Sequence, residues 1–593
     1  MPFYKAPLEE MNFLFSDVFA IDRRQDLEGF ADVADLREAI FSEAARLAEE
    51  ELTPLNRVGD LEGCKRQADG TVTTPKGFKE AFDKMAQGGW LGLSVPVEYG
   101  GQGLPLVLSQ VVNEFQISAN MAFSMYPGLT IGAAAALLVH GSAEQKKTYV
   151  PKMASGEWTG TMNLTEAHCG TDLGLLRTRA QRKDDGSFAI TGTKIFISAG
   201  DHDLTSNIIH LVLARIEGAP AGIKGVSLFV VPKYLVNPDG SLGAHNNVSC
   251  GSIEHKMGIH GSPTCVMNFD GATGWMIGEE NKGMQGMFVM MNEARLGVAT
   301  QGLALSEVAC QNALAYARER LQGRALTGAK APDKPADPII VHPDIRRTLL
   351  TIRAFNEAAR AFALWTAFNS DIAHRSGDEK ERQRANDHLG LMTPVLKAFL
   401  TEHGFANAVQ AQQVLGGHGY IAEHGLEQFV RDARIAMIYE GANGIQALDL
   451  LGRKLPRDGG RAIMGFFAEV TAFNKDNGDV EAMKPFVGPL AAALAHLQRA
   501  TGWMMQNALA APDNGAAGAT DYLHLFGFVV LGYMWARIAK AVVERGEGAS
   551  RELAARLVVG RFYMERMLPE TQLRLARVES GAATVMELAD DLL

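Results

Sequence analysis

I-Y-E-G-A-N-G-I-Q, residues 438–446, is the most informative stretch of this 593-residue chain. It places a single acid, Glu440, between an apolar pair of residues and the glycine-rich start of a predicted helix. Apolar neighbours disfavour the charged carboxylate, which suits a general base that removes a proton from carbon. Gly441 and Gly444 allow a ligand to approach the backbone, and Asn443 is predicted to cap a helix over Ile445–Leu451. The stretch therefore predicts a catalytic loop.

A second interpretation of Glu440 is structural. A buried acid between two helices can pair with a nearby arginine, and Arg431 and Arg434 lie close in sequence. The tripeptide Tyr439–Gly441 alone favours this second interpretation, so the choice depends on the surrounding motifs.

The surrounding motifs identify a family. Q-V-L-G-G-H-G-Y (Gln413–Tyr420) is followed by R-D-A-R (Arg431–Arg434) and then by the catalytic stretch. This order resembles the C-terminal helical domain of acyl-CoA dehydrogenases.

Further matches occur in the family's order. Gly89–Gly103 resembles its N-terminal helical domain, while Met162–Asp172 and Lys194–Ser198 resemble its flavin-facing strands. N-E-A-R (Asn292–Arg295) and R-E-R-L-Q (Arg318–Gln322) fall where the family has its substrate-side helix and an intersubunit arginine. The resemblance covers residues 35–455.

Sequence periodicity agrees with the fold that the family implies, which is mainly α with a central β domain. Apolar residues recur at helical spacing over residues 30–160, and Ser142 and Gln145 form a predicted capping box. Alternating β-branched residues follow, with no long helices between them, which favours an antiparallel barrel or sandwich over a parallel sheet. The expected parts are an N-terminal extension (1–34), a helical domain (35–159), a β domain with the flavin site (160–280), a four-helix bundle (281–455) and an extra helical domain (460–593).

The extra domain is predicted to contain helices at Pro489–Gln506 and Asp521–Glu547, joined by a disorder-like Ala510–Ala519 segment. Pro489 suits the first turn of a helix, where no backbone donor is needed. Extended members of the family carry such a domain, including the methylmercaptopropionyl-CoA dehydrogenase group, which this chain resembles in its opening Y-K-A-P-L (Tyr4–Leu8) and in G-I-Q-A-L-D-L-L-G-R-K-L (Gly444–Leu455). The domain is expected to cover the core or form an interface; an inert appendage is the alternative.

The resemblance implies FAD and the residues that bind it. Thr165 and the backbone near Leu164 would face the edge of the flavin ring, Ser198 its reactive nitrogen, Phe196 its flat face, and Thr171 the pyrophosphate and substrate. Arg320, Gln322, Gln413, Gly416 and Gly417 would reach a neighbouring subunit's cofactor. The cofactor-binding positions implied are Met162, Leu164, Thr165, Thr171, Phe196, Ser198, Arg320, Gln322, Gln413, Gly416, Gly417, Ala442 and Asn443.

The resemblance also implies the substrate-binding residues Thr171, Asn292, Arg295 and Gly441. Some branches of the family place the base one residue before the arginine, but that residue is Ala294 here. Glu440 is therefore the one catalytic candidate, and no metal is implied.

Several positions depart from the family pattern. His168 and Cys169 replace small residues in the turn at 167–171, and Pro343 and His418 replace common polar residues near the cofactor. His418 is interpreted as an ordinary loop histidine rather than a catalytic one. After Glu440, Ala442 and Gly444 stand where Thr and Gln are frequent.

The activity implied is the FAD-dependent α,β-dehydrogenation of a saturated acyl-CoA to a trans-2-enoyl-CoA. Electrons would pass to electron-transferring flavoprotein, and the substrate would be 3-(methylthio)propanoyl-CoA or a short, medium or long fatty acyl-CoA. Two alternatives stay open: an acyl-CoA oxidase that uses O2, and a catalytically silent flavin-binding scaffold.

Composition supports this assignment by exclusion. A net charge of −11 without a basic cluster argues against nucleic acid as a partner. The five cysteines show no spacing typical of zinc or disulfide frameworks. The start of the chain does not resemble a targeting segment, and the apolar run Phe526–Ala536 is too short to span a bilayer, so a cytoplasmic homodimer without a membrane segment is expected.

Overall fold

The computed structural model describes residues 2–593, except for four side chains, those of Asn292, Glu293, Leu509 and Glu547. The chain forms two compact units, one of residues 43–297 and one of residues 1–42 together with 298–593. Helices α2 (Val33–Arg46) and α8 (Gly283–Glu319) each carry the chain from one unit into the other.

In the unit of residues 43–297, helices come before strands. These helices are α3 (Thr53–Glu62), α4 (Phe78–Gln87), α5 (Leu106–Ala119), α6 (Met121–His140) and α7 (Ala143–Ala154). The predicted capping box is confirmed at the start of α7: Gln145 N donates to Ser142 Oγ at 3.1 Å, and Ser142 N donates to Gln145 Oε1 at 2.9 Å.

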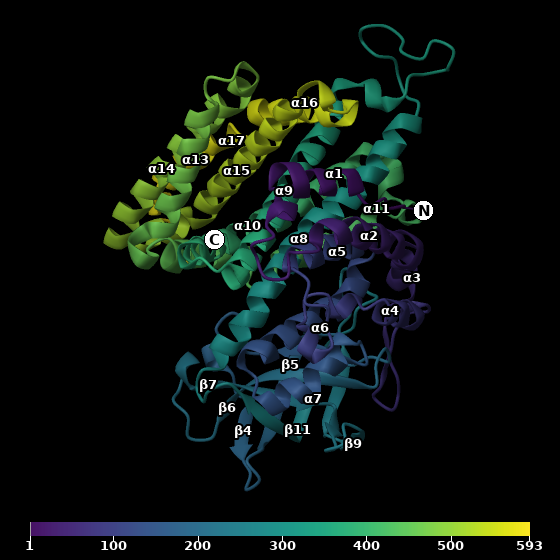
Figure 1. Cartoon of the computed structure of the whole chain (residues 1–593), viewed down its shortest axis with the longest axis vertical. Helices are drawn as coiled ribbons and strands as arrows, with labels where there is room; N and C mark the ends of the chain where they lie inside the picture. The colour runs from purple at the N-terminus through teal and green to yellow at the C-terminus, as the bar shows by residue number, and fades with distance from the viewer. Residues whose placement is uncertain (1) are drawn as a thin grey trace. The chain divides into compact units, whose positions relative to one another are not determined.

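The strands of this unit form a seven-stranded sheet. They are β3 (Trp158–Asn163), β4 (Arg179–Arg182), β5 (Phe188–Ser198), β6 (Asn207–Ile216), β7 (Val226–Pro232), β10 (Val248–Ile253) and β11 (Thr264–Ile277). Strand β7 pairs with both β6 and β11, so β11, β5, β4, β6 and β7 close into a ring (Figure 1). The barrel expected from the sequence is confirmed, with the difference that β6 pairs in parallel with β3 and β4. Two short pairs, β1–β2 (Lys65–Arg66, Val72–Thr73) and β8–β9 (Tyr234–Val236, Leu242–His245), lie outside it.

Two apolar cores cover the two faces of this sheet. One packs α6 and α7 against β3, β6 and β7 and includes Trp158 and Leu211. The other is formed by strand residues, among them Phe188, Phe229 and Phe269. Burial on both sides explains the nearly continuous apolar sequence of β6 and β7.

The other unit is helical and contains the predicted bundle. Its helices before residue 455 are α1 (Leu8–Phe13), α9 (Pro343–Arg375), α10 (Glu379–Val414), α11 (Leu426–Arg434) and α12 (Asn443–Asp449), together with the C-terminal part of α8. A Cβ on Gly404 would lie 2.2 Å from the carbonyl oxygen of Gly302, so α8 and α10 are in close backbone contact there. Ser306, Asn356 and Asn407 hydrogen-bond across α8, α9 and α10 beside this contact.

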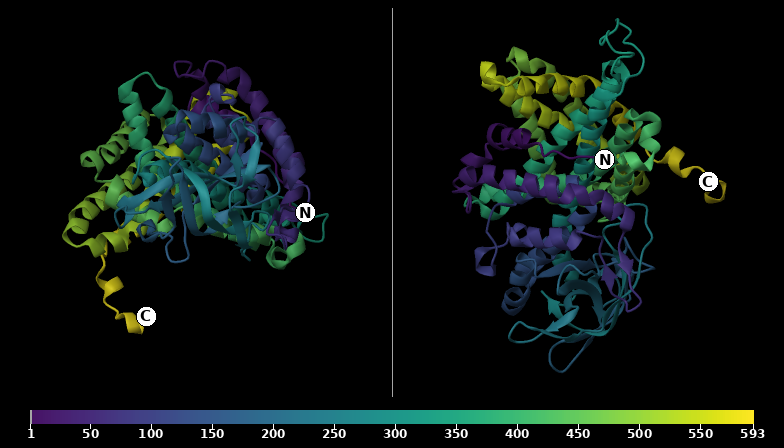
Figure 2. Two further views of the ribbon diagram at one scale, coloured as in Figure 1. Left: turned by 90° about the horizontal axis from the view of Figure 1, so that it is seen from below. Right: turned by 90° about the vertical axis from the view of Figure 1, so that its right-hand side faces the viewer.

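Six helices follow residue 460: α13 (Arg461–Asn477), α14 (Lys484–Ala510), α15 (Pro512–Arg545), α16 (Arg551–Arg566), α17 (Glu570–Glu579) and α18 (Ala583–Met586). Figure 1 shows α13, α14, α15 and α17 side by side. In both views of Figure 2 the last residues, which are exposed, extend away from these helices.

Two sequence predictions for this region were wrong. The Ala510–Ala519 segment is helical, apart from a break at Ala511, and Pro489 lies inside α14 rather than in its first turn. The helix begins earlier, at Lys484, and Pro485 lies in its first turn. Proline is tolerated there because a backbone N–H in the first turn has no acceptor within the helix.

A buried charge network connects the N-terminal extension to these helices. Arg360 donates to Glu10 at 2.7 Å, and Arg556 on α16 donates to Glu357 on α9 at 2.6 Å. Arg360 also lies 3.1 Å from Glu307. Opposite charges compensate one another, which buried ionic groups require.

Two helices, α6 and α15, are long and apolar enough to cross a membrane by length and composition alone. Their most apolar windows are 67% and 83% buried inside the molecule, which is typical of core helices. The apolar run Phe526–Ala536 lies inside α15, and its residues are buried.

Candidate active site

Glu440 lies in a loop between a 3-10 turn (Ile435–Met437) and α12. Its φ of +56° is in the left-handed region, and Gly441 follows with a φ of +84°. A residue with a side chain adopts this conformation rarely, and it persists only where its surroundings enforce it. The side chain of Glu440 is half-buried.

Lys397, a fully buried residue of α10, holds the backbone of this loop. Its Nζ donates to the carbonyl oxygen of Gly441 at 2.9 Å and to Asn443 Oδ1 at 3.0 Å. Gln446 Nε2 donates to the same Gly441 carbonyl at 3.2 Å. Two donors on one carbonyl fix the Gly441–Ala442 peptide, one residue beyond Glu440.

The side chain of Asn443 is turned toward α10. Its Nδ2 donates to the Ala398 carbonyl and to Glu402 Oε2, both at 3.2 Å, and its Oδ1 accepts from Lys397 and from Thr401 at 3.2 Å. Two donors and two acceptor positions are all that a primary amide has. The predicted helix cap at Asn443 was therefore wrong: α12 begins at Asn443 itself, and its N-cap Ala442 makes no side-chain cap bond. A contact of Asn443 with a cofactor would use its backbone.

Tyr439 anchors the other side of the loop. Its hydroxyl donates to Gln301 Oε1 on α8. Burial raises the pKa of Tyr439, and the neighbouring charge of Glu440 raises it further, so the phenol stays protonated and keeps this bond. Of the arginines considered as partners of Glu440, Arg431 pairs with Glu427 at 2.6 Å, and Arg434 lies over the ring of Phe405.

The flavin-facing residues predicted from the sequence lie together in the unit of residues 43–297. They lie at the end of β3, in the segment after it, or at the end of β5, and a hydrogen bond from Ile195 N to the Thr165 carbonyl at 2.9 Å joins the two segments. Met162, Leu164, Thr165 and Ser198 are partly exposed. Phe196 is 59% exposed, although it is a large apolar side chain, and its φ is +60°. A flat apolar surface beside hydroxyl groups fits a flavin ring, which needs both.

Glu166 supports the unusual turn at residues 167–171. Its backbone exchanges hydrogen bonds of 2.9 and 3.0 Å with Cys169. Its carboxylate accepts from Lys194 Nζ at 2.9 Å and from the backbone amides of Arg177 and Thr178 at 2.7 and 3.0 Å. Burial opposes ionisation of Glu166, but Lys194 and these donors outweigh it and lower its pKa to about 2. Of the two larger residues in this turn, His168 is exposed, whereas Cys169 is buried and its backbone is paired with that of Glu166.

Glu166, His168 and Cys169 also bring three potential metal ligands within 4.8 Å of one another. The carboxylate of Glu166 is already occupied by Lys194 and by backbone donors, and His168 Nε2 lies 3.0 Å from the Leu175 carbonyl. The cluster is explained as a support for the turn.

On the substrate-side helix, Arg295 is 6% exposed. The side chain of Asn292 lies outside the described residues. Ala294, where some branches of the family carry the base, is half-buried in α8.

The residues expected to meet a neighbouring subunit are exposed in the helical unit. Arg320 and Gln322 follow the end of α8, and their loop is organised by buried Asp337, which accepts from the backbone amides of Ala325, Lys330 and Ala331. Gln413, Gly416 and Gly417 are exposed at the end of α10, and both glycines have open space where a Cβ would lie.

His418, beside these glycines, behaves as the loop histidine that the sequence analysis favoured. Its Nδ1 lies 2.9 Å from the Tyr316 hydroxyl, and its ring stacks on His424 with centroids 4.8 Å apart.

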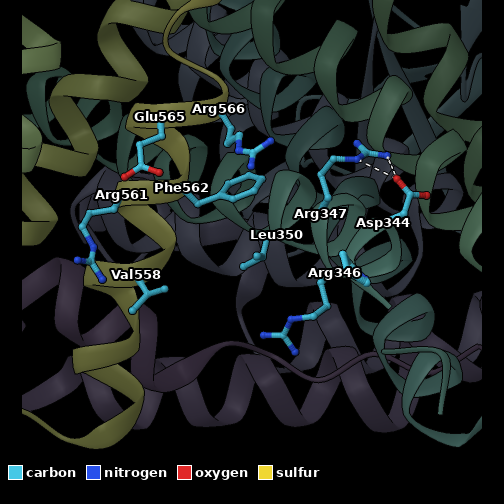
Figure 3. A pocket seen from close by; sticks show the side chains of 10 residues that line it. Asp344, Arg346, Arg347, Leu350, Val558, Arg561, Phe562, Glu565 and Arg566 are labelled. Atoms are coloured by element: carbon cyan, nitrogen blue, oxygen red, sulfur yellow. Dashed lines mark hydrogen bonds and ion pairs between the residues drawn. The ribbon is translucent and has the colours of Figure 1, made fainter. Parts of the chain in front are cut away.

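A separate groove of about 740 Å³ lies between the N-terminal turns of α9 and the outer face of α16 (Figure 3). Its floor is apolar and its rim is rich in arginine, and Arg347 pairs with Asp344 at 2.8 Å. The lining residues are Pro343, Asp344, Arg346, Arg347, Leu350, Val558, Arg561, Phe562, Glu565 and Arg566. None of the predicted flavin or substrate residues that the structure describes lines this groove.

Sequence analysis missed the residues behind the loop, above all Lys397 and Glu402. A signal for Lys397 was present, because it is a single cation in the apolar helical run Pro394–Leu400. Lysine is almost never fully buried unless it is paired, so a lysine at a core position indicates a specific acceptor.

Comparison with known protein families gives four consecutive matches. They are "Acyl-CoA dehydrogenase, N-terminal domain" over residues 35–157, "Acyl-CoA dehydrogenase, middle domain" over 161–272, "Acyl-CoA dehydrogenase, C-terminal domain" over 281–455 and "Acetyl-CoA dehydrogenase C-terminal like" over 466–589.

Similar proteins span the whole chain. The 3-methylmercaptopropionyl-CoA dehydrogenase of Ruegeria pomeroyi is 40% identical over 97% of this chain and 98% of its own length. The broad-specificity linear acyl-CoA dehydrogenase FadE5 of Mycobacterium tuberculosis is 33% identical over 99% of both chains. The crystal structure of Caenorhabditis elegans ACDH-11 in complex with C11-CoA has the same fold, with a TM-score of 0.79 at 19% identity over 99% of this chain and 96% of that one.

The chain belongs to the acyl-CoA dehydrogenase family, in the form that carries an extra C-terminal helical domain. It is an FAD flavoprotein with acyl-CoA dehydrogenase activity.

Proposed function

We propose that this enzyme oxidises a saturated acyl-CoA to the trans-2-enoyl-CoA, with Glu440 as the base. The observation that carries the proposal is the conformation of the loop: Glu440 is held at a φ of +56° by contacts that Lys397, Gln446 and Tyr439 make on both sides of it. Strained backbone conformations of this kind cluster at active sites, where the surrounding structure holds them in place.

The reaction removes one proton and one hydride from adjacent carbons. The thioester acidifies the α-carbon, and the Glu440 carboxylate takes that proton while the pair of electrons forms the new double bond. FAD, when bound, supplies the acceptor for the hydride from the β-carbon. The backbone N–H of Glu440 donates to the thioester oxygen, where negative charge develops.

The residues proposed to bind FAD are those predicted from the sequence. Met162, Leu164, Thr165, Thr171, Phe196 and Ser198 would serve one flavin, and Arg320, Gln322, Gln413, Gly416 and Gly417 that of a partner subunit. Exposure of both sets supports this assignment. Ala442 and Asn443 would contribute backbone groups, and Arg295, Asn292, Thr171 and Gly441 would bind the substrate.

The proposed substrate is 3-(methylthio)propanoyl-CoA, with short to long fatty acyl-CoAs as the second candidate. The first is supported by the 40% identity to the Ruegeria enzyme, the second by the 33% identity to the broad-specificity one. We further propose a cytoplasmic homodimer that passes its electrons to electron-transferring flavoprotein.

The test is an anaerobic titration of the purified yellow protein with a panel of acyl-CoAs. We expect the flavin absorbance to bleach, fastest with the true substrate, and electron-transferring flavoprotein to restore it. Failure of every saturated acyl-CoA to bleach the flavin would contradict the proposal and favour a silent scaffold. Stoichiometric hydrogen peroxide in air at the turnover rate would indicate an oxidase instead.

A further inference from the structure

His524 of α15, in the extra C-terminal domain, lies beside Glu402, which contacts the helix that follows the catalytic loop. We propose that His524, acting through Glu402, is a positioning residue for the loop that carries Glu440. The proposal rests on the proposed function, in which Glu440 is the base.

The contacts form a chain from the extra domain to the loop. His524 is 2% exposed, and its Nε2 lies 3.6 Å from Glu402 Oε2 on α10. The same carboxylate oxygen accepts from Asn443 Nδ2 at 3.2 Å. Asn443 is the first residue of α12, directly after the segment Glu440–Ala442.

Charge fixes the orientation of Asn443. Its Oδ1 faces the ammonium of Lys397 at 3.0 Å, while its Nδ2 faces the carboxylate of Glu402 at 3.2 Å. Rotation of the amide by half a turn would place oxygen against carboxylate and NH2 against ammonium, so the pair selects one orientation. The nearby His524 ring nitrogen and the hydrogen bond from Asn443 lower the pKa of Glu402 to about 2 against the opposing effect of burial, so that carboxylate is ionised.

A close helix contact brings His524 within reach. Gly527 lies near His524 in α15, and a Cβ at Gly527 would be 2.2 Å from Cδ2 of Phe399 on α10. Because Gly527 has no side chain, the ring of Phe399 packs against the backbone of α15, and the two helices approach each other close to Glu402. This part of the extra domain therefore supports the site as well as covering the bundle.

Four variants test the proposal by anaerobic stopped-flow bleaching with the best acyl-CoA of the panel. His524→Phe keeps a planar ring but removes the ring nitrogen that faces Glu402. His524→Gln retains an N–H donor. His403→Phe is the matched control, because His403 belongs to the same aromatic cluster and meets the His524 ring edge-on, with centroids 5.5 Å apart. Glu440→Gln reports separately on the base.

We expect His524→Phe to bleach about tenfold or more slowly at saturating substrate, because small misplacements of catalytic groups can cost on the order of 10²-fold. The concentration for half-maximal rate should change less than about threefold, since that position touches no substrate. His524→Gln should recover to within about threefold of the wild-type rate, and His403→Phe should stay within about twofold.

Equal rates for His524→Phe and His403→Phe, or no recovery in His524→Gln, would overturn the proposal. If His524→Phe does not retain FAD, Glu402→Ala is measured instead, because the side chain of Glu402 is 41% exposed. A wild-type bleaching rate in Glu402→Ala would also overturn the proposal. A fast Glu440→Gln would instead contradict the proposed base. A slow Glu440→Gln with wild-type His524→Phe would contradict this inference alone.

Discussion

Two residues with side chains, Glu440 and Phe196, have positive φ angles of 56° and 60° at positions predicted for catalysis and flavin stacking. Both predictions came from motif position, and neither conformation can be read from residue type, because glycine is the residue expected there. The conformation is imposed by partners distant in sequence, such as Lys397 and Gln301 for the catalytic loop.

Glu166 gives a stability prediction at the same scale. Glu166→Gln would leave the ammonium of fully buried Lys194 without its counter-charge, and breaking such a pair from one side costs about 3–5 kcal/mol. Urea unfolding with FAD bound should show a lower midpoint. Asp185→Asn, at an exposed turn, is the control and should change the midpoint little.

The same carboxyl predicts an acid dependence. Its folded-state pKa of about 2 lies below the ordinary value of 4.5, so its stabilisation is present above pH 4.5 and is lost as the pH falls toward 2. The wild-type protein should therefore lose its stability advantage over Glu166→Gln across that range. An advantage that is constant down to the lower pH would contradict the charged pair.

At the scale of elements, sequence periodicity predicted the helices, the barrel and the capping box at Ser142. It misjudged Ala510–Ala519, whose small residues suggested disorder. Small residues at these positions allow α15 to pack closely against α14. A Cβ on Gly515 would be 2.6 Å from Ala508 Cβ, and one on Gly518 would be 2.7 Å from Met504 Cε. Composition cannot distinguish a flexible glycine from one that lets two helices meet.

The extra helices are expected to be indispensable. Trp535 of α15 donates to the Ala354 carbonyl of α9 at 2.9 Å, and most of α15 is buried. Removal of residues 460–593 should therefore expose a large apolar surface and give insoluble or flavin-poor protein. Removal of residues 583–593 alone, which are nearly all exposed, is the control and should leave solubility and FAD content unchanged. A soluble, active product of the long truncation would show the domain to be an appendage.

At the scale of the whole molecule, Arg320, Gln413, Gly416 and Gly417 are exposed, as expected for groups that reach a partner's cofactor. The protein should be a homodimer with about one FAD per chain. Light scattering should give twice the 64.0 kDa chain mass. Arg320→Ala should lower the FAD content, whereas Arg551→Ala, at the exposed start of α16, should not. A single-chain mass with flavin bound would contradict the shared site.

Ordered motifs gave the family and its reaction class, while the supports of the catalytic loop became visible only in three dimensions. Two of these supports, Lys397 and Glu402, lie in α10, whereas His524 lies in α15, more than a hundred residues later in the sequence. No local sequence pattern joins them. The acyl group is set by side chains around the bound thioester, which motif spacing does not specify.

The central claim is that Glu440 takes the α-proton, and Glu440→Gln tests it most directly. Gln is isosteric, so the fold and FAD content should be unchanged, and substrate should still bind through the backbone N–H. Loss of a general base typically costs on the order of 10²–10⁴-fold. With an acyl-CoA that bleaches the wild-type flavin anaerobically, the variant should bleach at least about 10²-fold more slowly. Bleaching within about tenfold of the wild-type rate, far short of that loss, would contradict Glu440 as the base.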